Sequence, residues 1–266
     1  HVSLVPVVGA VGEQKTKPTQ HSIQALRSAG LSPHMLACRS KHPLEQSVMD
    51  KLALFCHVDP KCIINLCDVS NIWHVPLVML EQDALRNIMK QLQIPYQAPD
   101  LERWAYRATK WDNVTTPVTI ALVGKYTGLG DSYLSVTKAL LHSSIACDRK
   151  LDLLWIEASD LEEETKQEDA EKYEAAWASI KKAQGVLVPG GFGGRGTEGK
   201  MIAAKFAREN KVPYLGICLG MQCMVIEYAR HVLNLADAHS TEMEPETKNP
   251  AVIFMPEGSK THMGGT

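Results

Sequence analysis

A single cysteine between two glycines carries the clearest chemical signal in this sequence. Cys218 lies in the string Gly216-Ile217-Cys218-Leu219-Gly220, between a short apolar run at 212–215 and a predicted helix at 221–230. Small flanking residues let a chain turn sharply from strand to helix, so the pattern is typical of a nucleophile elbow with cysteine as the nucleophile. A helix N-terminus favours the thiolate, and the backbone N–H of Leu219 is then a natural oxyanion donor.

The alternative interpretation is that Cys218 is a packing cysteine, because most free cysteines are buried. For an isolated Gly-x-Cys-x-Gly string this would be the better interpretation, since short motifs often occur by chance. Here a predicted strand precedes the string and a predicted helix follows it. That context favours the nucleophile.

A glycine-rich loop lies upstream of the cysteine, directly after a predicted strand at 185–188. Its sequence is Pro189-Gly190-Gly191-Phe192-Gly193-Gly194-Arg195-Gly196. No Gly-Lys-Ser/Thr follows, so it is not a phosphate-binding P-loop, and no acidic partner follows at the spacing of a dinucleotide fingerprint. We expect its backbone amides to close on a small anion or oxyanion beside Cys218.

Two lysines near the start of the chain form a second candidate site. Lys15 and Lys17 occupy alternate positions ahead of a predicted helix, where ammonium groups and unpaired amide N–H groups can hold a triphosphate. The alternative is an ordinary exposed turn. Pro18 restricts the backbone there, and the polar Thr19 and Gln20 follow it, which favours a preformed anion site.

Composition limits the classes of protein to consider. The 266 residues suggest about two domains, and 45% apolar with 22% charged residues is ordinary for a globular protein. A net charge of -2 gives no electrostatic case for nucleic acid or a membrane surface as partner. Seven cysteines without a Cys-x-x-Cys pair argue against a disulfide framework and a zinc site, and suit a reducing, cytoplasmic compartment. No apolar run approaches a membrane span, and the N-terminus does not resemble a signal peptide.

Strands alternate with helices in two successive regions, which implies parallel sheets covered on both faces. The first region has predicted strands at 2–6, 35–38 and 62–67 and helices at 22–29, 44–56 and 75–92. The second has strands at 118–123, 151–156, 185–188 and 212–215 and helices at 131–145, 168–183, 197–210 and 221–230. The acidic run 162–164 is expected to be solvated. Neither end of the sequence looks like a domain end, so we expect an internal piece of a longer protein.

The glycine loop, the helix after it and the Gly-x-Cys-x-Gly-Met-Gln string together resemble the class I glutamine amidotransferase family. The strings at 12–20, 38–40, 50–56, 193–199 and 234–242 also resemble the CTP synthase family, over essentially the whole chain. The resemblance implies two parallel-sheet α/β domains, the second a flavodoxin-like class I glutaminase. It further implies three segments: the C-terminal part of an amidoligase domain at 1–97, a linker at 98–116, and an amidotransferase domain at 117–266 that is truncated at its C-terminus.

What the resemblance implies for function is an ATP-dependent amination of UTP to CTP, a step of pyrimidine nucleotide biosynthesis. ATP would phosphorylate the 4-oxygen of UTP, and ammonia from glutamine hydrolysed at Cys218 would displace the phosphate. The family also implies magnesium, with ligands outside this chain, GTP as an allosteric activator, CTP as an inhibitor, and homotetramers that form filaments.

The resemblance assigns three sets of binding residues. UTP or CTP would contact Lys15, Thr16, Lys17, Pro18, Thr19, Gln20 and Lys51, although Lys51 is equally well interpreted as a solvated helix residue. ATP would contact Arg39, Cys67, Asp68 and Val69; because Cys67-Asp68 replaces a lysine–aspartate pair of some relatives, this contact could be made by the backbone alone. Glutamine would contact Gly191, Leu219, Gly220, Met221, Gln222 and Glu242, whose carboxylate would bind the α-ammonium group.

A base for the cysteine is missing from the pattern. The family supplies it from a His-Pro-Glu motif, whereas Met255-Pro256-Glu257 has no preceding histidine, and His231, His239 and His262 lie in other contexts. The phosphate-binding loop and magnesium carboxylates are also absent. We therefore expect that the chain alone does not make CTP.

Two alternatives stay open. One is a non-catalytic fragment that binds nucleotide or builds filaments. The other is a different cysteine-elbow amidotransferase or hydrolase, which would not need the loop at 15–20.

Overall fold

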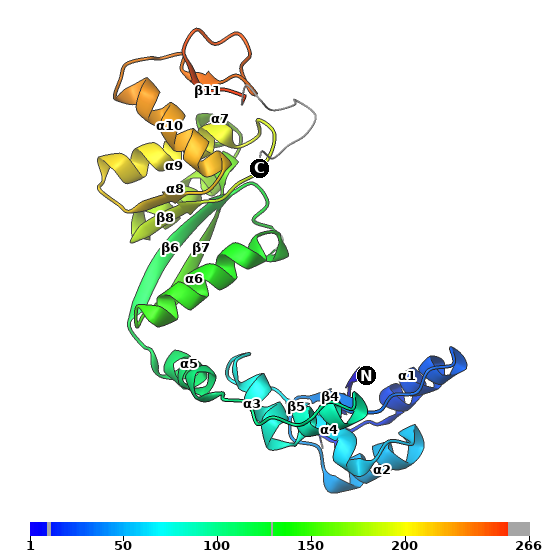
Figure 1. Ribbon diagram of the computed structural model, residues 1–266. Coiled ribbons are helices and arrows are strands. Elements are labelled where there is room, and N and C mark those ends of the chain that lie inside the picture. The colour runs from blue at the N-terminus through cyan, green and yellow to red at the C-terminus, as the bar shows by residue number, and fades with distance from the viewer. Residues whose placement is uncertain (10–11, 129, 255–266) are drawn as a thin grey trace. The chain divides into compact units, whose positions relative to one another are not determined.

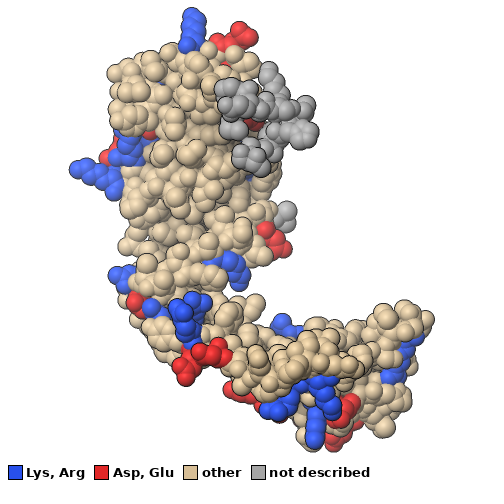
Figure 2. Space-filling view, in the orientation of Figure 1, with Lys and Arg blue, Asp and Glu red and all other residues tan. Residues whose placement is uncertain are grey.

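The computed structural model describes residues 1–9, 12–128 and 130–254. The chain divides into two compact units, His1–Val114 and Thr115–Thr266, and each is described by itself (Figure 1). The main sheet of each unit is parallel, as the alternation of strands and helices predicts. Within the described ranges, no helix has the length and apolar character needed to cross a membrane. On the face drawn in Figure 2, basic and acidic side chains lie in small separate groups.

The first unit contains a three-stranded sheet in the order β1-β4-β5, made of β1 (Val2–Leu4), β4 (Leu36–Ser40) and β5 (Ile63–Cys67). An antiparallel hairpin, β2 (Val7–Val8) and β3 (Glu13–Gln14), precedes the first helix. A 3-10 turn, η1, spans Pro60–Cys62. The helices are α1 (Lys17–Ser28), α2 (Gln46–Cys56), α3 (His74–Glu81), α4 (Ala84–Gln91) and α5 (Glu102–Asn113). Buried side chains of α1, α2, β4 and β5 form the core of this unit.

The single helix predicted at 75–92 is wrong, because α3 and α4 are separated at Asp83. The backbone of Asp83 is left-handed, with a φ of 54°. The preceding residue, Gln82, is used by strand β5: its side-chain amide accepts from the N–H of Asn65 at 2.8 Å and donates to the carbonyl of Asn65 at 2.9 Å. Apolar periodicity cannot reveal such a long-range contact, so the break was not predictable.

Helix α5 occupies the segment predicted as a partly helical connection, 98–116. Asp112 on α5 accepts hydrogen bonds at 2.7–2.8 Å from three side chains at the start of α3, those of Ser70, Asn71 and His74. These bonds, that of His74 first, hold the pKa of the Asp112 carboxyl below its usual value. Contacts of this kind group residues 98–114 with the first unit. The domain limits at 97 and 117 stay a prediction.

The second unit contains a four-stranded parallel sheet in the order β7-β6-β8-β9. Numbered within the unit this order is 2-1-3-4, the doubly wound arrangement of flavodoxin-like folds. The strands are β6 (Pro117–Gly124), β7 (Lys150–Glu157), β8 (Gly185–Val188) and β9 (Tyr214–Gly216). The helices are α6 (Leu134–Ala146), α7 (Glu163–Glu168), α8 (Ala170–Lys182), α9 (Thr197–Glu209) and α10 (Leu219–His231). The 3-10 turns η2 (Gly130–Tyr133) and η3 (Ala158–Leu161) and the short parallel pair β10 (His239–Ser240) and β11 (Pro250–Val252) complete it.

Two layers of helices cover this sheet (Figure 1). Ala121 and Val123 of β6 belong to one buried cluster, with residues of α8 and α9, whereas Leu122 belongs to another, with residues of α6. Successive side chains of a strand point to opposite faces, so a central strand covered on both sides must be apolar throughout. This explains why the strand predicted at 118–123 is apolar at five of its six positions, with Thr119 as the exception.

Two helices of this unit begin at other residues than the sequence predicts. The helix at 168–183 is divided by Asp169, whose carboxylate caps α8 by accepting from the backbone N–H of Lys172 at 3.1 Å. The helix at 131–145 starts with the 3-10 turn η2 and becomes α-helical at Leu134. Both differences concern helix starts, where local hydrogen bonds rather than apolar spacing decide the geometry.

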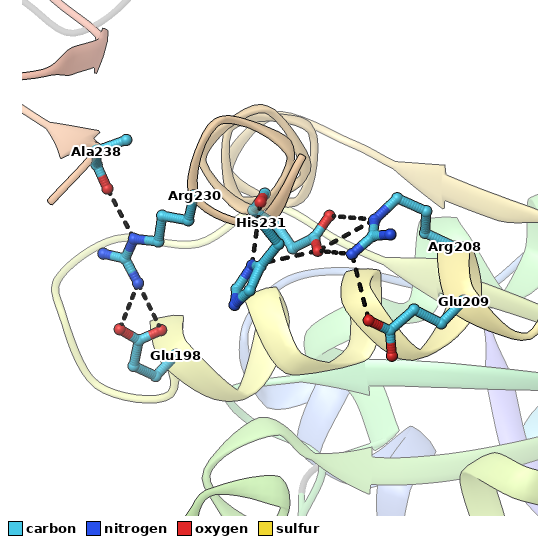
Figure 3. Close-up of polar contacts among 7 residues, drawn as sticks. Glu198, Arg208, Glu209, Arg230, His231 and Ala238 are labelled. Atoms are coloured by element: carbon cyan, nitrogen blue, oxygen red, sulfur yellow. Dashed lines mark hydrogen bonds and ion pairs between the residues drawn. The ribbon is translucent and has the colours of Figure 1, made fainter. Parts of the chain in front are cut away.

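Two arginine–glutamate pairs connect α9, α10 and the segment after α10 (Figure 3). Arg208 donates three bonds to the carboxylate of Glu227, the shortest at 2.6 Å, and Glu227 is only 1% exposed. Arg230 instead bonds the exposed Glu198 at 2.7 Å, and its Nε donates to the carbonyl of Ala238. The glutamate is therefore buried in the first pair and exposed in the second.

We expect Arg208→Met to destabilise the second unit strongly. The substitution leaves the Glu227 carboxylate buried without its main partner, and uncompensated buried charges typically cost about 3–5 kcal/mol. Urea unfolding followed by circular dichroism measures the loss. The matched control is Glu198→Gln, which breaks an exposed pair and should cost less than about 1 kcal/mol. Equal losses in the two variants would contradict the burial of Glu227.

Candidate active site

The predicted nucleophile elbow is present between β9 and α10. Cys218 precedes the first residue of α10 and has a φ of 53° and a ψ of −113°. Non-glycine residues avoid positive φ, and holding one there costs on the order of 1–3 kcal/mol. The backbone N–H of Ile217 donates to the carbonyl of Val188 on the neighbouring strand at 2.9 Å. Strain at the cysteine is thus maintained by the sheet beside it.

Gly216 and Gly220, the two glycines of the elbow, occupy positions where a side chain would collide with the backbone. A Cβ on Gly216 would lie 2.6 Å from backbone atoms of Gly220, one turn further on. A Cβ on Gly220 would lie 1.9 Å from the carbonyl oxygen of Val188, which brings α10 directly onto β8. The hydroxyl of Tyr214 also donates to the carbonyl of Gly220 at 2.8 Å. The spacing Gly-x-Cys-x-Gly is therefore a packing requirement of this corner.

Exposure distinguishes Cys218 from the other cysteines. All seven cysteines are free, and Cys218 is exposed, whereas Cys38, Cys56 and Cys223 are buried. Burial raises the pKa of the Cys38 and Cys223 thiols to about 11, which keeps them protonated and unreactive. The alternative interpretation of Cys218 as a buried packing cysteine is therefore wrong. Cys147 is the other exposed thiol, on the turn after α6 and away from any elbow.

The glycine loop after β8 lies against the elbow. A Cβ on Gly190 would be 3.2 Å from the Cβ and 3.6 Å from the sulfur of Cys218. Parallel strands end at one edge of a sheet, so the loops that follow β8 and β9 meet there. Gly191 lies next to Leu219, since a Cβ on Gly191 would be 3.9 Å from the Cδ2 of Leu219. The structure thus brings Cys218, Gly191 and Leu219 together.

Two buried lysines support this loop, and sequence reasoning missed both. Lys125 follows β6 and is 1% exposed; its ammonium donates to the carbonyls of Phe192, at 3.1 Å, and of Gly193. Lys200, on α9, is 0% exposed and donates to the carbonyls of Pro189 at 2.8 Å and Gly190 at 3.5 Å. A signal for Lys200 exists in the sequence. It lies three and seven residues before the buried Ala203 and Ala207, on the same face of α9, where a lysine is out of place.

Two acidic residues also hold the site in shape. Glu157 accepts from the N–H of Thr127 at 3.2 Å and from the guanidinium of Arg195 at 3.3 Å. Glu162 accepts from the N–H of Gly199 at 2.8 Å, near the start of α9, and burial raises the pKa of its carboxyl. The expectation that the run 162–164 is only solvated is therefore wrong for Glu162, because its neighbours in the chain do not reveal that α9 packs over it.

The remaining glutamine-binding candidates lie around the same corner. Gly220 is buried, and Met221 is 50% exposed. Gln222 is half-buried, and its backbone N–H donates to the carbonyl of Cys218 at 3.1 Å. Glu242 follows β10 and is exposed, and its backbone N–H donates to the hydroxyl of Ser240 at 3.3 Å. Its carboxylate acts to raise the pKa of Lys125, against the larger lowering by burial, so the two charges lie within electrostatic reach.

The nucleotide candidates of the first unit surround the start of α1. Lys15 pairs with Glu13 at 2.6 Å, and Lys15 and then Lys51 hold the pKa of the Glu13 carboxyl below its usual value. Lys51, from α2, therefore lies in the same electrostatic environment as the loop. Lys17 is the first residue of α1 and is exposed, as is Pro18 in the same turn. Three cations thus gather at a helix N-terminus.

The polar residues of that string point inward. Thr16 is buried and accepts from the side-chain amide of Gln20 at 3.0 Å. Thr19 is 0% exposed; its hydroxyl donates to the carbonyl of Leu4 at 3.3 Å and accepts from Ser3 at 2.9 Å. Thr19 therefore fastens α1 to β1, whereas the bond between Thr16 and Gln20 lies within the first turn of α1.

The ATP candidates lie at the carboxyl edge of the same sheet. Arg39, on β4, pairs with Asp68 at 3.1 Å, and both side chains are exposed. Cys67 ends β5 opposite Ser40, and the N–H of Asp68 donates to the carbonyl of Ser40 at 3.1 Å. Cys67 and Val69 are half-buried. In the described part of the chain, no group of three or more His, Cys, Asp or Glu residues could hold a metal ion.

We expect the stability of the second unit to depend on Lys200 at alkaline pH. The pKa of the Lys200 ammonium falls from 10.5 to about 8: burial is the largest cause, Lys125 acts in the same direction, and Cys223, Cys218 and Glu157 act to raise it. Between these two values the unfolded chain binds the additional proton, so this group makes the protein more stable as pH rises through that window, by at most about 1.4 kcal/mol per pH unit. Urea unfolding at several pH values measures the slope.

Lys200→Met is the comparison for that measurement, because it lacks the titrating group. The buried thiols Cys38 and Cys223 have raised pKa values and act in the opposite direction, so only the difference between the two proteins isolates Lys200. Identical pH slopes in the two proteins would contradict the lowered pKa.

A strained, exposed cysteine at a strand-to-helix corner, facing a glycine loop at the carboxyl edge of a doubly wound sheet, defines an α/β protein with a nucleophile elbow. Residues 129–265 match the family described as "Glutamine amidotransferase class-I", and residues 1–94 match "CTP synthase N-terminus". The chain therefore belongs to the class I glutamine amidotransferase family, and its first 94 residues are similar to the N-terminal part of CTP synthases.

Individual relatives agree with this placement. The chain is 54% identical over 278 residues to "CTP synthase" of Eremothecium gossypii, covering 100% of this chain and 48% of the relative. It is 51% identical over 269 residues to "CTP synthase 2" of Xenopus laevis, covering 100% and 46%. A solved structure, "Trypanosoma brucei CTPS - glutaminase domain with bound acivicin", is 40% identical with a TM-score of 0.46, covering 52% of this chain and 50% of that one. The chain spans about half the length of the curated relatives that it matches.

Proposed function

We propose that this chain supplies Cys218 as the glutaminase nucleophile of a cytoplasmic CTP synthase, which hydrolyses the side-chain amide of glutamine and aminates UTP with the ammonia released. The observation that carries the proposal is the elbow: Cys218 is an exposed residue with a φ of 53°, and the glycine loop is packed against it. A catalytic nucleophile must be accessible to substrate, and amide N–H groups must lie nearby to stabilise the oxyanion that forms during the attack. Cys218 is exposed, and Gly191 and Leu219, whose N–H groups would serve this purpose, lie beside it, which supports the proposal.

The reaction proceeds by acyl transfer. The Cys218 thiolate attacks the amide carbon of glutamine, and the N–H groups of Leu219 and Gly191 stabilise the oxyanion that forms. Collapse of this intermediate breaks the C–N bond, and the nitrogen takes a proton and leaves as ammonia. Water then cleaves the thioester, which yields glutamate and restores the thiol. Glu242 binds the α-ammonium group of the substrate.

The first unit would bind the nucleotides. Lys15, Lys17 and Lys51 supply cations beside a helix N-terminus, where the phosphates of UTP or of the inhibitor CTP fit. Arg39 at the neighbouring sheet edge suits the phosphates of ATP. The described residues do not fit a magnesium ion, so no step is assigned to one. GTP activation and assembly into tetramers and filaments belong to the whole protein.

Selective labelling of Cys218 tests the glutaminase proposal. A chloroketone analogue of glutamine should alkylate Cys218 faster than Cys147, and excess glutamine should protect Cys218 only. Cys147 is the internal control, since it is exposed but not at an elbow. Peptide mapping by mass spectrometry gives both rates. Equal rates at the two thiols, or no protection by glutamine, would refute the proposal.

A non-catalytic, nucleotide-binding role is the second candidate, and the cations around α1 favour it independently of Cys218. UTP or CTP should raise the melting temperature, because ligand that binds only the folded state stabilises it. Lys17→Gln should remove this shift, whereas Lys61→Gln, an exposed lysine at η1, should retain it. A shift that survives Lys17→Gln would rule out the site at α1.

A further inference from the structure

Lys125 and Lys200 are exceptional because each is a buried ammonium group without a carboxylate partner among the described residues. Moving an ammonium group out of water is costly unless hydrogen bonds replace the lost hydration. Here four backbone carbonyls replace it, and all four belong to the glycine loop. Burial lowers the pKa of both lysines, as expected for charges held in a dry environment. Packing alone would be served better by an apolar side chain.

The two lysines hold different parts of the loop. Lys125 binds the carbonyls of Phe192 and Gly193, whereas Lys200 binds those of Pro189 and Gly190. The peptide units held by Lys200 are the ones next to the elbow, since a Cβ on Gly190 would be 3.6 Å from the sulfur of Cys218. Lys200 thus acts on the backbone nearest the reacting atom.

Because the peptide unit is planar, the hydrogen bond from Lys200 to the Gly190 carbonyl also determines the direction of the next N–H group. The carbonyl of Gly190 and the N–H of Gly191 belong to one planar unit and point in opposite directions. An ammonium group fixed on the carbonyl therefore turns the N–H of Gly191 away from Lys200. Glycines have no side chain to fix their peptide planes, so a loop of this composition would otherwise sample several orientations.

We propose that Lys200 is a positioning residue of the glutaminase site, which holds the Pro189-Gly190-Gly191 backbone so that the Gly191 N–H serves as an oxyanion donor. It touches neither substrate nor nucleophile in this role. The inference rests on the proposed glutamine hydrolysis at Cys218.

Alkylation of Cys218 in Lys200→Met tests the proposal with two reagents. The chloroketone analogue passes through an oxyanion at its carbonyl, whereas iodoacetamide alkylates the thiolate by direct displacement. Loss of one oxyanion donor typically costs about 10²- to 10³-fold. We expect the chloroketone rate to fall by about this factor and the iodoacetamide rate to change by less than about threefold, since the second reagent needs no donor. Lys205→Met, on the same helix and half-buried, should leave both rates unchanged.

The outcomes separate this inference from the proposed function. If wild-type Cys218 shows no preference over Cys147 for the chloroketone, the glutaminase proposal fails. If the preference is present and folded Lys200→Met retains it, only the positioning role fails. Should Lys200→Met not fold by circular dichroism, Lys200→Arg keeps the charge but displaces the donors. In that variant the chloroketone rate should fall relative to the iodoacetamide rate, and an unchanged ratio would overturn the inference.

Discussion

Gly220→Ala is expected to detach α10 from β8 and to remove the selective reactivity of Cys218. The new Cβ would stand 1.9 Å from the backbone carbonyl oxygen of Val188, well inside contact distance. A backbone oxygen in a sheet cannot move aside as a flexible side chain can, so the helix must shift. We expect a loss of about 3 kcal/mol or more, at the upper end of overpacking effects. Urea unfolding and the chloroketone labelling rate of Cys218 measure the two consequences.

Gly194→Ala is the matched control for this substitution. Gly194 lies in the glycine loop, and a Cβ there would meet nothing within 4 Å. Its stability should stay within about 0.5 kcal/mol of the wild type. A Gly220→Ala protein as stable as Gly194→Ala would mean that α10 does not lie directly on β8.

Ammonia release by the 266-residue chain is expected to fall about 10⁴- to 10⁶-fold below that of a full-length relative, the range found when one member of a nucleophile–base unit is lost. The described histidines after Cys218 are engaged elsewhere. The Nδ1 of His231 lies 3.1 Å from the carbonyl oxygen of Glu227, and that of His239 accepts from the N–H of Ser240 at 2.9 Å. His262 and the string 255–257 lie outside the described residues. A coupled glutamate dehydrogenase assay gives the rate.

The control for this measurement is Cys218→Ala, which sets the background from spontaneous hydrolysis and contaminating enzymes. A chain that releases ammonia within about tenfold of the full-length rate, and loses this activity in Cys218→Ala, would show that a base is present. In that case the assignment of His231 and His239 to structural roles would be wrong.

The elements that position the site were predictable because their signals are local. The apolar run of β8 and the glycine spacing around Cys218 each follow from residues next to one another, and the structure has β8 at the predicted limits. Helix starts were less predictable, since α10 begins at Leu219 and α1 at Lys17, both earlier than apolar periodicity indicates. Caps and turns, rather than periodicity, determine these positions.

What could not be predicted depends on contacts between residues distant in sequence. Lys200 meets the glycine loop from another element, and Glu162 meets Gly199 in the same way. A lysine or glutamate in a single sequence is interpreted as solvated, because most are. Only the folded structure reveals which lysines and glutamates are buried and bond to backbone groups in place of water.

The backbone at Cys218 has a consequence for how this protein would respond to selection or engineering. Of the twenty amino acids, glycine alone would adopt that backbone conformation without penalty, so the proposed nucleophile is also a residue that the fold tolerates poorly. Searches for heat-resistant variants would tend to discard the thiol. Robustness and reactivity compete at one position, and any improved version should be screened for both at once.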